Sequence, residues 1–279
     1  MKWGASAPHS PFSARVQNNV RMDSICDDLH AEHLALDVLV ADLTEAQWSL
    51  ATPAAEWSIR DQISHLWFFD QRAALALRDP DEFAADMHRL LAAGGTKASV
   101  EPGRRMSGTE LLAAWRADRN DLIALARSVD PSSRVPWYGP AMAARSFITA
   151  RLMETWAHGQ DVADALGVQR AATARLKHVA HIGVRARPFS YMIIGRELPE
   201  VPPYVALRAP DGSLWEWGEP TSDGVRGEAL DFCLVVTQRR HLADTGLEVT
   251  GASAVEWMGF AQAFAGEPGT GRSPGQFAR

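Results

Sequence analysis

The chain has 279 residues, of which 46% are hydrophobic and 22% charged, a composition typical of a folded protein with a substantial core. Its net charge is −6 and it has no basic run, so we expect no nucleic acid among its partners. No stretch of about 18 apolar residues is present, so we expect no membrane partner either. Cys26 and Cys233 are too few for a disulfide framework and lack zinc-finger spacing, which favours a reducing, cytoplasmic location.

The first helix is predicted to begin at Asp23. Residues 1–21 show no helical period and no apolar core of a secretory signal, so we predict a flexible leader there. Whether translation starts at Met1 or Met22 stays open. After this segment, apolar side chains recur at helical spacing, and one face carries Ile25, Leu29, His33, Leu36, Val40 and Leu43.

Three more long helices follow. Ser58 with Asp61, and Ser107 with Glu110, have the spacing of capping boxes, so a second helix begins after Ser58 and a third runs to about residue 128. The proline-containing loop 130–140 separates the third helix from a fourth, over about 141–166, which ends at Gly167. Four long helices joined by moderate loops predict a four-helix bundle over 22–170.

The pattern changes after the bundle. Residues 171–200 are predicted to form a connecting helix, over about 172–187, and a linker. Residues 201–279 are predicted to form a small domain with a Gly/Pro-rich tail, containing strands at 204–209, 214–218 and 247–251 and helices at 227–242 and 253–266. The predicted fold class is therefore α+β, an N-terminal four-helix bundle followed by a small C-terminal α/β domain.

The fourth helix carries the strongest chemical signal. Glu154 and His158 are four residues apart and share one helix face, among neighbours that are mostly apolar. A buried carboxylate is costly unless it is paired or bound to a metal, and bundle cores build metal sites from facing helices. His65, in the middle of the second helix, is the candidate third ligand. On the residues alone, a metal site and an ordinary Glu–His helix pair are both acceptable interpretations.

Two motifs add a resemblance. WSIRDQISHL in the second helix and RLMETWAHGQDVADALG in the fourth resemble the metal-binding motifs of the DinB-like superfamily, and most closely its mycothiol-dependent maleylpyruvate isomerase-like branch. The resemblance runs from about residue 22 to 272, through PWYGPAMAARSF, ALDFCLVVTQRRH and AQAFAGEPGTGR, and points to an actinobacterial family of metal-binding proteins. It implies a DinB-like bundle, zinc ligands at His65, Glu154 and His158, and a C-terminal domain that closes over the metal cleft with a substrate-binding arginine. Arg239 and Arg240 are candidates for that arginine, with an exposed helix end as the alternative.

Other side chains are weaker candidates for the surroundings of the site, each with an ordinary structural alternative. Asp161 follows His158 by three residues and either orients its imidazole or lies on the helix surface. Arg151 precedes Glu154 by three residues and either supports it or forms a simple ion pair. His33 points into the cleft or is a hydrogen-bonded core residue, and His181 lines the cleft or a solvated face. Trp137 and Tyr138, together with Trp57 and Trp67, either wall the cleft or belong to the core. The run 266–273 is not a phosphate loop, because Arg272 replaces the required lysine and no helix follows.

The hypothesis that follows is a metal-dependent enzyme of the mycothiol-dependent isomerase or thiol-transferase type, acting on a small molecule. The expected ion is Zn2+, with Fe2+ or Ni2+ as alternatives. The resemblance implies mycothiol as a thiol co-substrate that adds to an electrophile. The alternatives are a thiol-independent hydrolase, lyase or cyclase of specialised metabolism, and a non-catalytic metal- or ligand-binding protein. We expect a monomer or homodimer, and the residues do not identify the substrate or the general acid or base.

Overall fold

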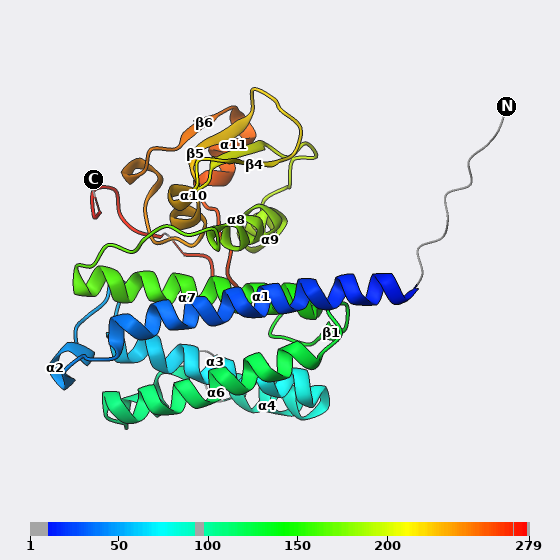
Figure 1. The fold of residues 1–279 in the computed structure, drawn as a ribbon. Coiled ribbons are helices and arrows are strands. Elements are labelled where there is room, and N and C mark those ends of the chain that lie inside the picture. The colour runs from blue at the N-terminus through cyan, green and yellow to red at the C-terminus, as the bar shows by residue number, and fades with distance from the viewer. Residues whose placement is uncertain (1–10, 93–97, 270, 278–279) are drawn as a thin grey trace.

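Four long helices form the N-terminal part of the protein. The computed structural model describes residues 11–92, 98–269 and 271–277. Helices α1 (Pro11–Val40), α3 (Ile59–Arg78), α6 (Gly108–Ser128) and α7 (Ala144–Leu166) form a closed bundle, in which α1 and α3 each pack against both α6 and α7 (Figure 1). The predicted four-helix bundle is confirmed.

Local sequence signals set most of the helix ends. The Ser58 hydroxyl accepts a hydrogen bond from the Asp61 backbone N–H, and the Asp61 carboxylate accepts one from the Ser58 N–H. Ser107 and Glu110 form the same reciprocal pair at the start of α6. At the end of α7, Gly167 adopts the left-handed conformation, with φ of 67°, as its predicted capping position requires. All three of these local predictions are confirmed.

The start of the first helix differs from the prediction. Helix α1 begins at Pro11, not at Asp23, so residues 11–21 of the predicted flexible leader are helical, and residues 1–10 lie outside the described part. The lack of an amphipathic pattern in 11–21 suggested a leader. However, none of residues 12–21 is a glycine or proline, and proline is tolerated in the first turn of a helix.

Short elements occupy the bundle loops. Helices α2 (Glu45–Trp48), α4 (Pro80–Ala92) and α5 (Glu101–Arg104) lie in the connections before and after α3. Strands β1 (Arg134–Val135) and β2 (Met142–Ala143) pair in antiparallel fashion and lead into α7. This small ribbon fixes the position of the loop that carries Trp137 and Tyr138.

A four-stranded mixed sheet forms the C-terminal part. Its strand order is β4 (Leu214–Trp217), β3 (Tyr204–Arg208), β5 (Gly224–Glu228), β6 (Glu248–Thr250), with β3 and β5 parallel and the outer pairs antiparallel. The predicted strands correspond to β3, β4 and β6. Strand β5 was missed because its sequence, GVRGE, contains two glycines and no alternating pattern. The helix predicted from residue 227 is shorter, α10 (Ala229–Val236), because 224–228 pair with β3.

Two further helix predictions need correction. The single connecting helix is in fact two, α8 (Leu176–Arg185) and α9 (Arg187–Ile193), and Pro188 lies in the first turn of the second, where proline needs no N–H partner. The last helix, α11 (Ala252–Met258), ends well before residue 266. The segment after it is held by tertiary hydrogen bonds instead, from the Ala263 N–H to the Val236 carbonyl and from the Gln262 N–H to the Ser190 hydroxyl.

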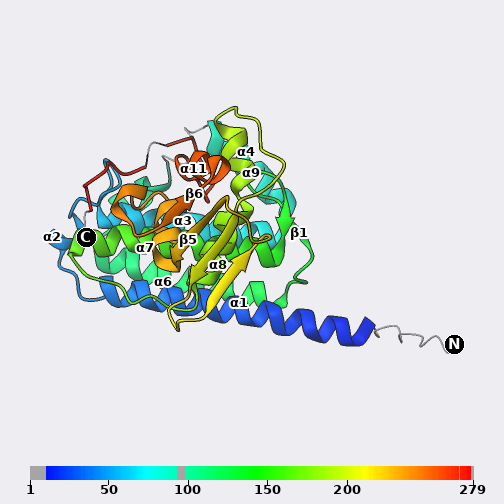
Figure 2. The same ribbon diagram turned by 90° about the horizontal axis from the view of Figure 1, so that it is seen from above.

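Helix α8 lies between the two parts of the chain. It packs against α7 of the bundle and against α10 of the C-terminal part. The sheet with α10 and α11 covers the side of α7 and α8 that faces away from α3 and α6 (Figures 1 and 2). One continuous cluster of buried hydrophobic side chains runs from α1 through α7 and α8 into the sheet. This packing holds the C-terminal part against α7, the helix that carries two of the candidate ligands.

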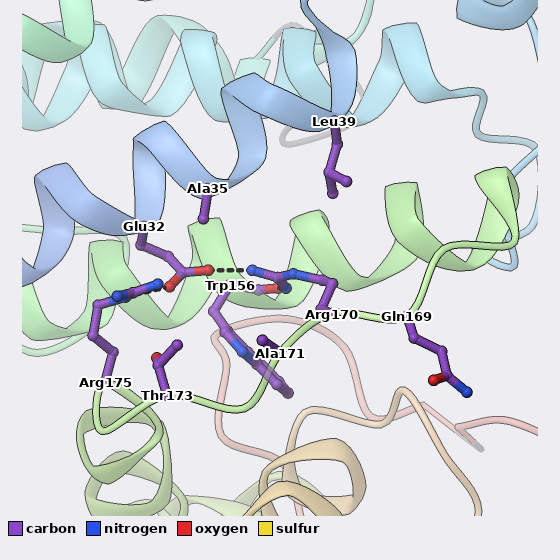
Figure 3. Close-up of a pocket in the computed structure, with 9 residues that line it drawn as sticks. All are labelled: Glu32, Ala35, Leu39, Trp156, Gln169, Arg170, Ala171, Thr173 and Arg175. Carbon is purple, nitrogen blue, oxygen red and sulfur yellow. Dashed lines mark hydrogen bonds and ion pairs between the residues drawn. The ribbon is translucent and has the colours of Figure 1, made fainter. Parts of the chain in front are cut away.

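The segment after α7 is tied to the outside of the bundle. The buried Glu32 carboxylate on α1 pairs with Arg170 and, at 2.7 Å, with Nε of Arg175 (Figure 3). Arg170 also donates to the Trp156 carbonyl at 2.8 Å. These residues border a small cavity of about 240 Å³. Among the described residues, no helix is long and apolar enough to cross a membrane.

Candidate metal centre

Three predicted ligands converge inside the bundle. Helix α3 supplies His65, and α7 supplies Glu154 and His158, one turn apart on the face that packs against α3. One donor atom from each of the three side chains lies within 4.8 Å of the others. The two imidazole rings have centroids 4.5 Å apart, and His158 Nε2 is 3.4 Å from Glu154 Oε2. Two imidazole nitrogens and one carboxylate oxygen match the donor set of an open divalent-metal site.

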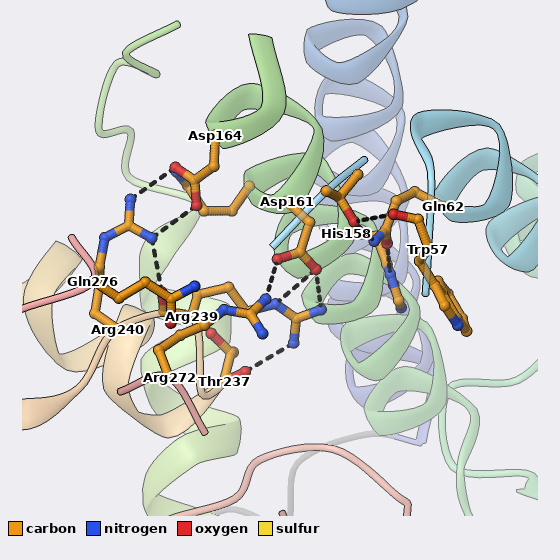
Figure 4. A network of polar contacts seen from close by, with 12 residues as sticks. Trp57, Gln62, His158, Asp161, Asp164, Thr237, Arg239, Arg240, Arg272 and Gln276 are labelled. Atoms are coloured by element: carbon orange, nitrogen blue, oxygen red, sulfur yellow. Dashed lines mark hydrogen bonds and ion pairs between the residues drawn. The ribbon is translucent and has the colours of Figure 1, made fainter. Parts of the chain in front are cut away.

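Hydrogen bonds determine which imidazole nitrogen of His158 faces the other ligands. The Thr52 hydroxyl donates to the Trp57 carbonyl at 2.9 Å, and the Gln62 side-chain N–H donates to Thr52 Oγ1 at 2.9 Å. The Gln62 carbonyl oxygen is therefore the group that contacts His158 Nδ1, at 2.5 Å, and it accepts a hydrogen bond from the Nδ1–H (Figure 4). This arrangement leaves the lone pair on Nε2, beside Glu154, free to bind a cation.

The second histidine has its own hydrogen-bond partner. His65 Nδ1 lies 2.9 Å from the Ser99 hydroxyl, in the segment that follows α4, so among the residues that the structure describes Nε2 is again the nitrogen left without a hydrogen bond. Ser99 is fully buried, and neighbouring Ser64 donates to the Ser99 carbonyl at 2.9 Å. Contacts of this kind fix the ring orientation of metal-binding histidines.

Aromatic rings cover the centre. Trp57 stacks on the His158 ring, with centroids 5.8 Å apart and an interplanar angle of 13°, and lies 5.0 Å from the His65 ring. Phe69 lies 4.7 Å from the His65 ring on the next turn of α3. These rings exclude water from one side of the donor atoms and raise the strength of electrostatic interactions there.

The protonation states suit cation binding. Burial lowers the pKa of His65 well below its usual value, and the nearby His158, Arg151 and Arg239 act in the same direction. Burial alone would raise the pKa of Glu154, but the adjacent His158 ring and the charges of Arg151 and Arg239 outweigh that effect and lower it. A neutral imidazole and an ionised carboxylate are the forms that bind metals.

Arg151 contacts a buried carboxylate and none of the three ligands. Its guanidinium donates to Asp70 Oδ1 on α3 at 2.9 and 3.2 Å, and both side chains are buried. The Trp115 indole N–H also donates to this carboxylate, at 3.0 Å. The Arg151–Asp70 pair therefore joins the two helices that carry the candidate ligands.

His33 is a core residue in this structure. It is fully buried, its Nε2 lies 3.8 Å from Asp70 Oδ2, and its ring meets Trp115 edge-on at 5.7 Å. Burial lowers the pKa of His33 well below its usual value. The structure therefore places His33 in the bundle core, against Asp70 and Trp115.

Asp161 does not orient His158, because Gln62 occupies that role. Its carboxylate instead accepts hydrogen bonds from Arg239 Nη2 at 2.9 Å and Arg272 Nη2 at 2.6 Å, both from the C-terminal part (Figure 4). Arg240 pairs with Asp164, one turn further along α7, at 2.7 Å. Both predicted arginines therefore attach the C-terminal part to α7.

The remaining predicted residues lie at different distances from the centre. Trp137 stacks on Phe83 and contacts Phe69, and Tyr138 meets Phe69 edge-on, so both rings contact the phenylalanine that lies against His65. His181, on α8, accepts a hydrogen bond from the Trp217 indole at 3.3 Å and lines a large cavity that extends to Glu154.

Sequence reasoning missed several neighbours of the centre. Gln62 precedes His65 by three residues, so helical spacing was an available signal for it. Ser99 and Arg272 lie far from the ligands in sequence, and only the packing of the chain brings them near.

The family model for the mycothiol maleylpyruvate isomerase N-terminal domain matches residues 29–163. Two uncharacterized proteins of Mycobacterium tuberculosis, from strains CDC 1551 / Oshkosh and ATCC 25618 / H37Rv, are each 44% identical over 248 residues, which is 88% of this chain and 96% of the relative.

Two solved structures share the fold. The crystal structure of a mycothiol-dependent maleylpyruvate isomerase has a TM-score of 0.56 at 12% identity, covering 89% of this chain and 96% of that one. A histidine-to-alanine mutant of such an isomerase has a TM-score of 0.57 at 12% identity, covering 78% and 90%. The chain therefore belongs to the same family as the M. tuberculosis proteins, in the maleylpyruvate isomerase-like branch of the DinB-like superfamily.

Proposed function

We propose that this protein is a metal-dependent enzyme of the isomerase or thiol-transferase type, in which His65, Glu154 and His158 hold one divalent cation, preferably Zn2+. The convergence of these three donors from two helices carries the proposal. The orientation of both imidazoles by Gln62 and Ser99 supports it. A cation bound there would supply Lewis acidity and lower the pKa of a coordinated thiol.

The chain's own residues supply the surroundings that such chemistry needs. Trp57 and Phe69 shield the donors on one side, while Glu154 also lines a cavity of about 910 Å³. That volume accommodates a small-molecule substrate together with part of a thiol. Because Cys26 and Cys233 are both fully buried, the nucleophilic thiol has to come from outside the chain.

The family points to mycothiol as that thiol. The thiolate sulfur would form a bond to an electrophilic carbon of the substrate, and the displaced electron pair would take up a proton. If the sulfur stays, the product is a thioether. If it leaves again after rotation about the former double bond, the net reaction is isomerisation and the thiol is regenerated.

Metal analysis tests the ligand set. The wild-type protein and His88→Ala, which removes an exposed histidine on α4, should each bind one equivalent of Zn2+ per chain, and His158→Ala should lose it. Equal metal content in all three proteins would refute the ligand assignment.

Thermal shift measurements with mycothiol, with and without the metal, then test the thiol. A shift that needs both the metal and mycothiol supports thiol chemistry, and product formation from maleylpyruvate or other enones tests catalysis. A metal-loaded protein that shows no shift with mycothiol but hydrolyses or cyclises a substrate would favour the thiol-independent alternative.

A further inference from the structure

A large cavity adjoins the candidate metal centre. It measures about 910 Å³ and lies between α7, α8 and the loop that joins β1 to β2, with Trp217, Ala263 and Ala265 of the C-terminal part at its border. Glu154 is the candidate ligand that lines it. A molecule in this cavity therefore approaches the centre from the side of Glu154.

The cavity carries an excess of positive charge. Among its lining residues in the described part of the chain, Glu154 is the one carboxylate, whereas Arg134, Arg145, Arg151, Lys177 and Arg185 are cationic. The protein as a whole has a net charge of −6, so this local excess runs against the overall balance. A concave surface lined by one sign of charge concentrates its field on ligands of the opposite sign.

Arg145 and Arg185 differ from the other arginines of the cavity in that their side chains have no partner in the described part of the chain. Arg151 is bound to Asp70, and Arg134 donates to the Ala141 carbonyl. By contrast, Arg145 and Arg185 form no ion pair and no side-chain hydrogen bond with any residue that the structure describes. Their guanidinium groups are therefore available to a ligand.

Helix geometry brings these cations to one place. Lys177, His181 and Arg185 follow one another at intervals of four along α8, so they share the face that lines the cavity. Arg145 faces them from the first turn of α7. Burial lowers the pKa of His181, and the charges of Arg185 and Arg145 lower it further, so both arginines act on the same imidazole.

The rest of the wall is apolar. Trp137, Phe147, Met153, Ile182 and Phe189 line the cavity, and Phe147 and Met153 lie on α7 on the way from Arg145 to Glu154. A ligand that fills this space needs an apolar body as well as an anionic end.

We propose that Arg145 and Arg185 bind the carboxylate or phosphate group of a small organic anion whose apolar body lies along α7 toward Glu154. Planar guanidinium groups suit this recognition because they donate two parallel hydrogen bonds to such oxygens. This proposal names a substrate class for the proposed function. It rests on the proposed function only in placing the reactive end of the ligand toward Glu154.

Binding of a matched set of probes tests the proposal. Isothermal titration with naphthoate, naphthyl phosphate and neutral naphthamide compares the same apolar body with and without an anionic group. The wild-type protein should bind at least one of the two anions about tenfold tighter than the amide, the scale of a charge-assisted hydrogen bond. The anion that binds tighter distinguishes a carboxylate from a phosphate ligand.

Charge-removing variants locate the site. Arg145→Gln/Arg185→Gln should lose the preference for the anion while keeping its affinity for the amide, and Arg145→Lys/Arg185→Lys should keep part of it. The control Arg78→Gln/Arg208→Gln removes two exposed arginines outside the cavity and should bind like the wild type. Circular dichroism of each variant shows whether it is folded.

We expect the preference for the anion to be independent of the metal. The titrations are repeated on wild-type protein stripped with a chelator and on His158→Ala, and both should keep the preference for the anion. The proposal is overturned if the amide binds as tightly as both anions, if neither anion binds, or if the Gln double variant keeps the wild-type preference. Loss of metal with an intact anion preference refutes the proposed function alone.

Discussion

Gln62 on α3 and His158 on α7 are joined by a hydrogen bond of 2.5 Å whose direction is fixed by the residues behind it. The Gln62 amide nitrogen donates to Thr52, and the Thr52 hydroxyl donates to the backbone carbonyl of Trp57, which only accepts. The proton is therefore on Nδ1 of His158, and Nε2 carries the lone pair. Gln62, which is not a proposed ligand, thus sets the tautomer of His158, which is one.

Replacing Gln62 should weaken the metal site without removing a ligand. Gln62→Leu leaves Nδ1 of His158 without its acceptor, and the affinity for Zn2+ should fall about tenfold to a hundredfold, the usual cost of losing such a partner. Competition with a chromophoric chelator measures the affinity. Gln169→Leu, an exposed glutamine after α7, is the control. Equal affinities for the two variants would show that the hydrogen bond does not support the site.

The capping box of α3 should make stability depend on pH. Burial would raise the pKa of Asp61, but its bonds to Arg104 and Ser58 outweigh this and lower the pKa below the usual 3.8. A carboxyl group with a depressed pKa adds stability above its unfolded pKa, and that stability is lost as the pH falls through the folded pKa.

Asp61→Asn should therefore destabilise the protein by about 0.5–2 kcal/mol at neutral pH, the range for a lost helix cap. The difference from the wild type should shrink below pH 3.8, the ordinary pKa of an aspartate side chain. Urea unfolding at several pH values measures both effects. A difference that stays constant down to the lowest pH would contradict the assignment.

Removing Asp161 should cost more than removing either of its partners. The carboxylate is fully buried and forms ion pairs with both Arg239 and Arg272, so Asp161→Ala leaves two mostly buried guanidinium groups without this counter-charge. We expect a loss of about 3–5 kcal/mol in the free energy of unfolding. Arg239→Ala or Arg272→Ala leaves the carboxylate one cation and should cost less. Denaturant titration of the three variants checks the order, and equal losses would show that the arginines do not share the carboxylate.

The chain's own thiols should be unreactive in the folded protein. Burial raises the pKa of the Cys26 thiol to about 11, and burial also raises the pKa of Cys233. Since the thiolate is the reactive form, iodoacetamide at mildly alkaline pH should label neither cysteine until the protein is unfolded. Peptide mass spectrometry before and after denaturation measures the labelling. Rapid labelling of Cys26 in the native state would contradict both the burial and the need for an external thiol.

The ends of the helices were the features that the sequence predicted best. Capping at Ser58 and Ser107 and termination at Gly167 depend on residues within one turn, and all three are as predicted. Strand β5 was missed because its pairing with β3 comes from a distant segment. The early start of α1 was missed because helical hydrogen bonds propagate through residues that have no amphipathic pattern of their own.

The sequence by itself determined the four long helices, the i, i+4 pairing of Glu154 with His158 and, through the family motifs, the pairing of both with His65. Spacing along one helix follows from its fixed rise and turn, so no tertiary information was needed. Only the tertiary structure decided that Gln62 rather than Asp161 contacts His158, that Asp161 binds Arg239 and Arg272, and that Arg145 and Arg185 line one cavity. These relationships join segments far apart in the chain, and the packing of α3, α7, α8 and the C-terminal part brings them within reach of one another.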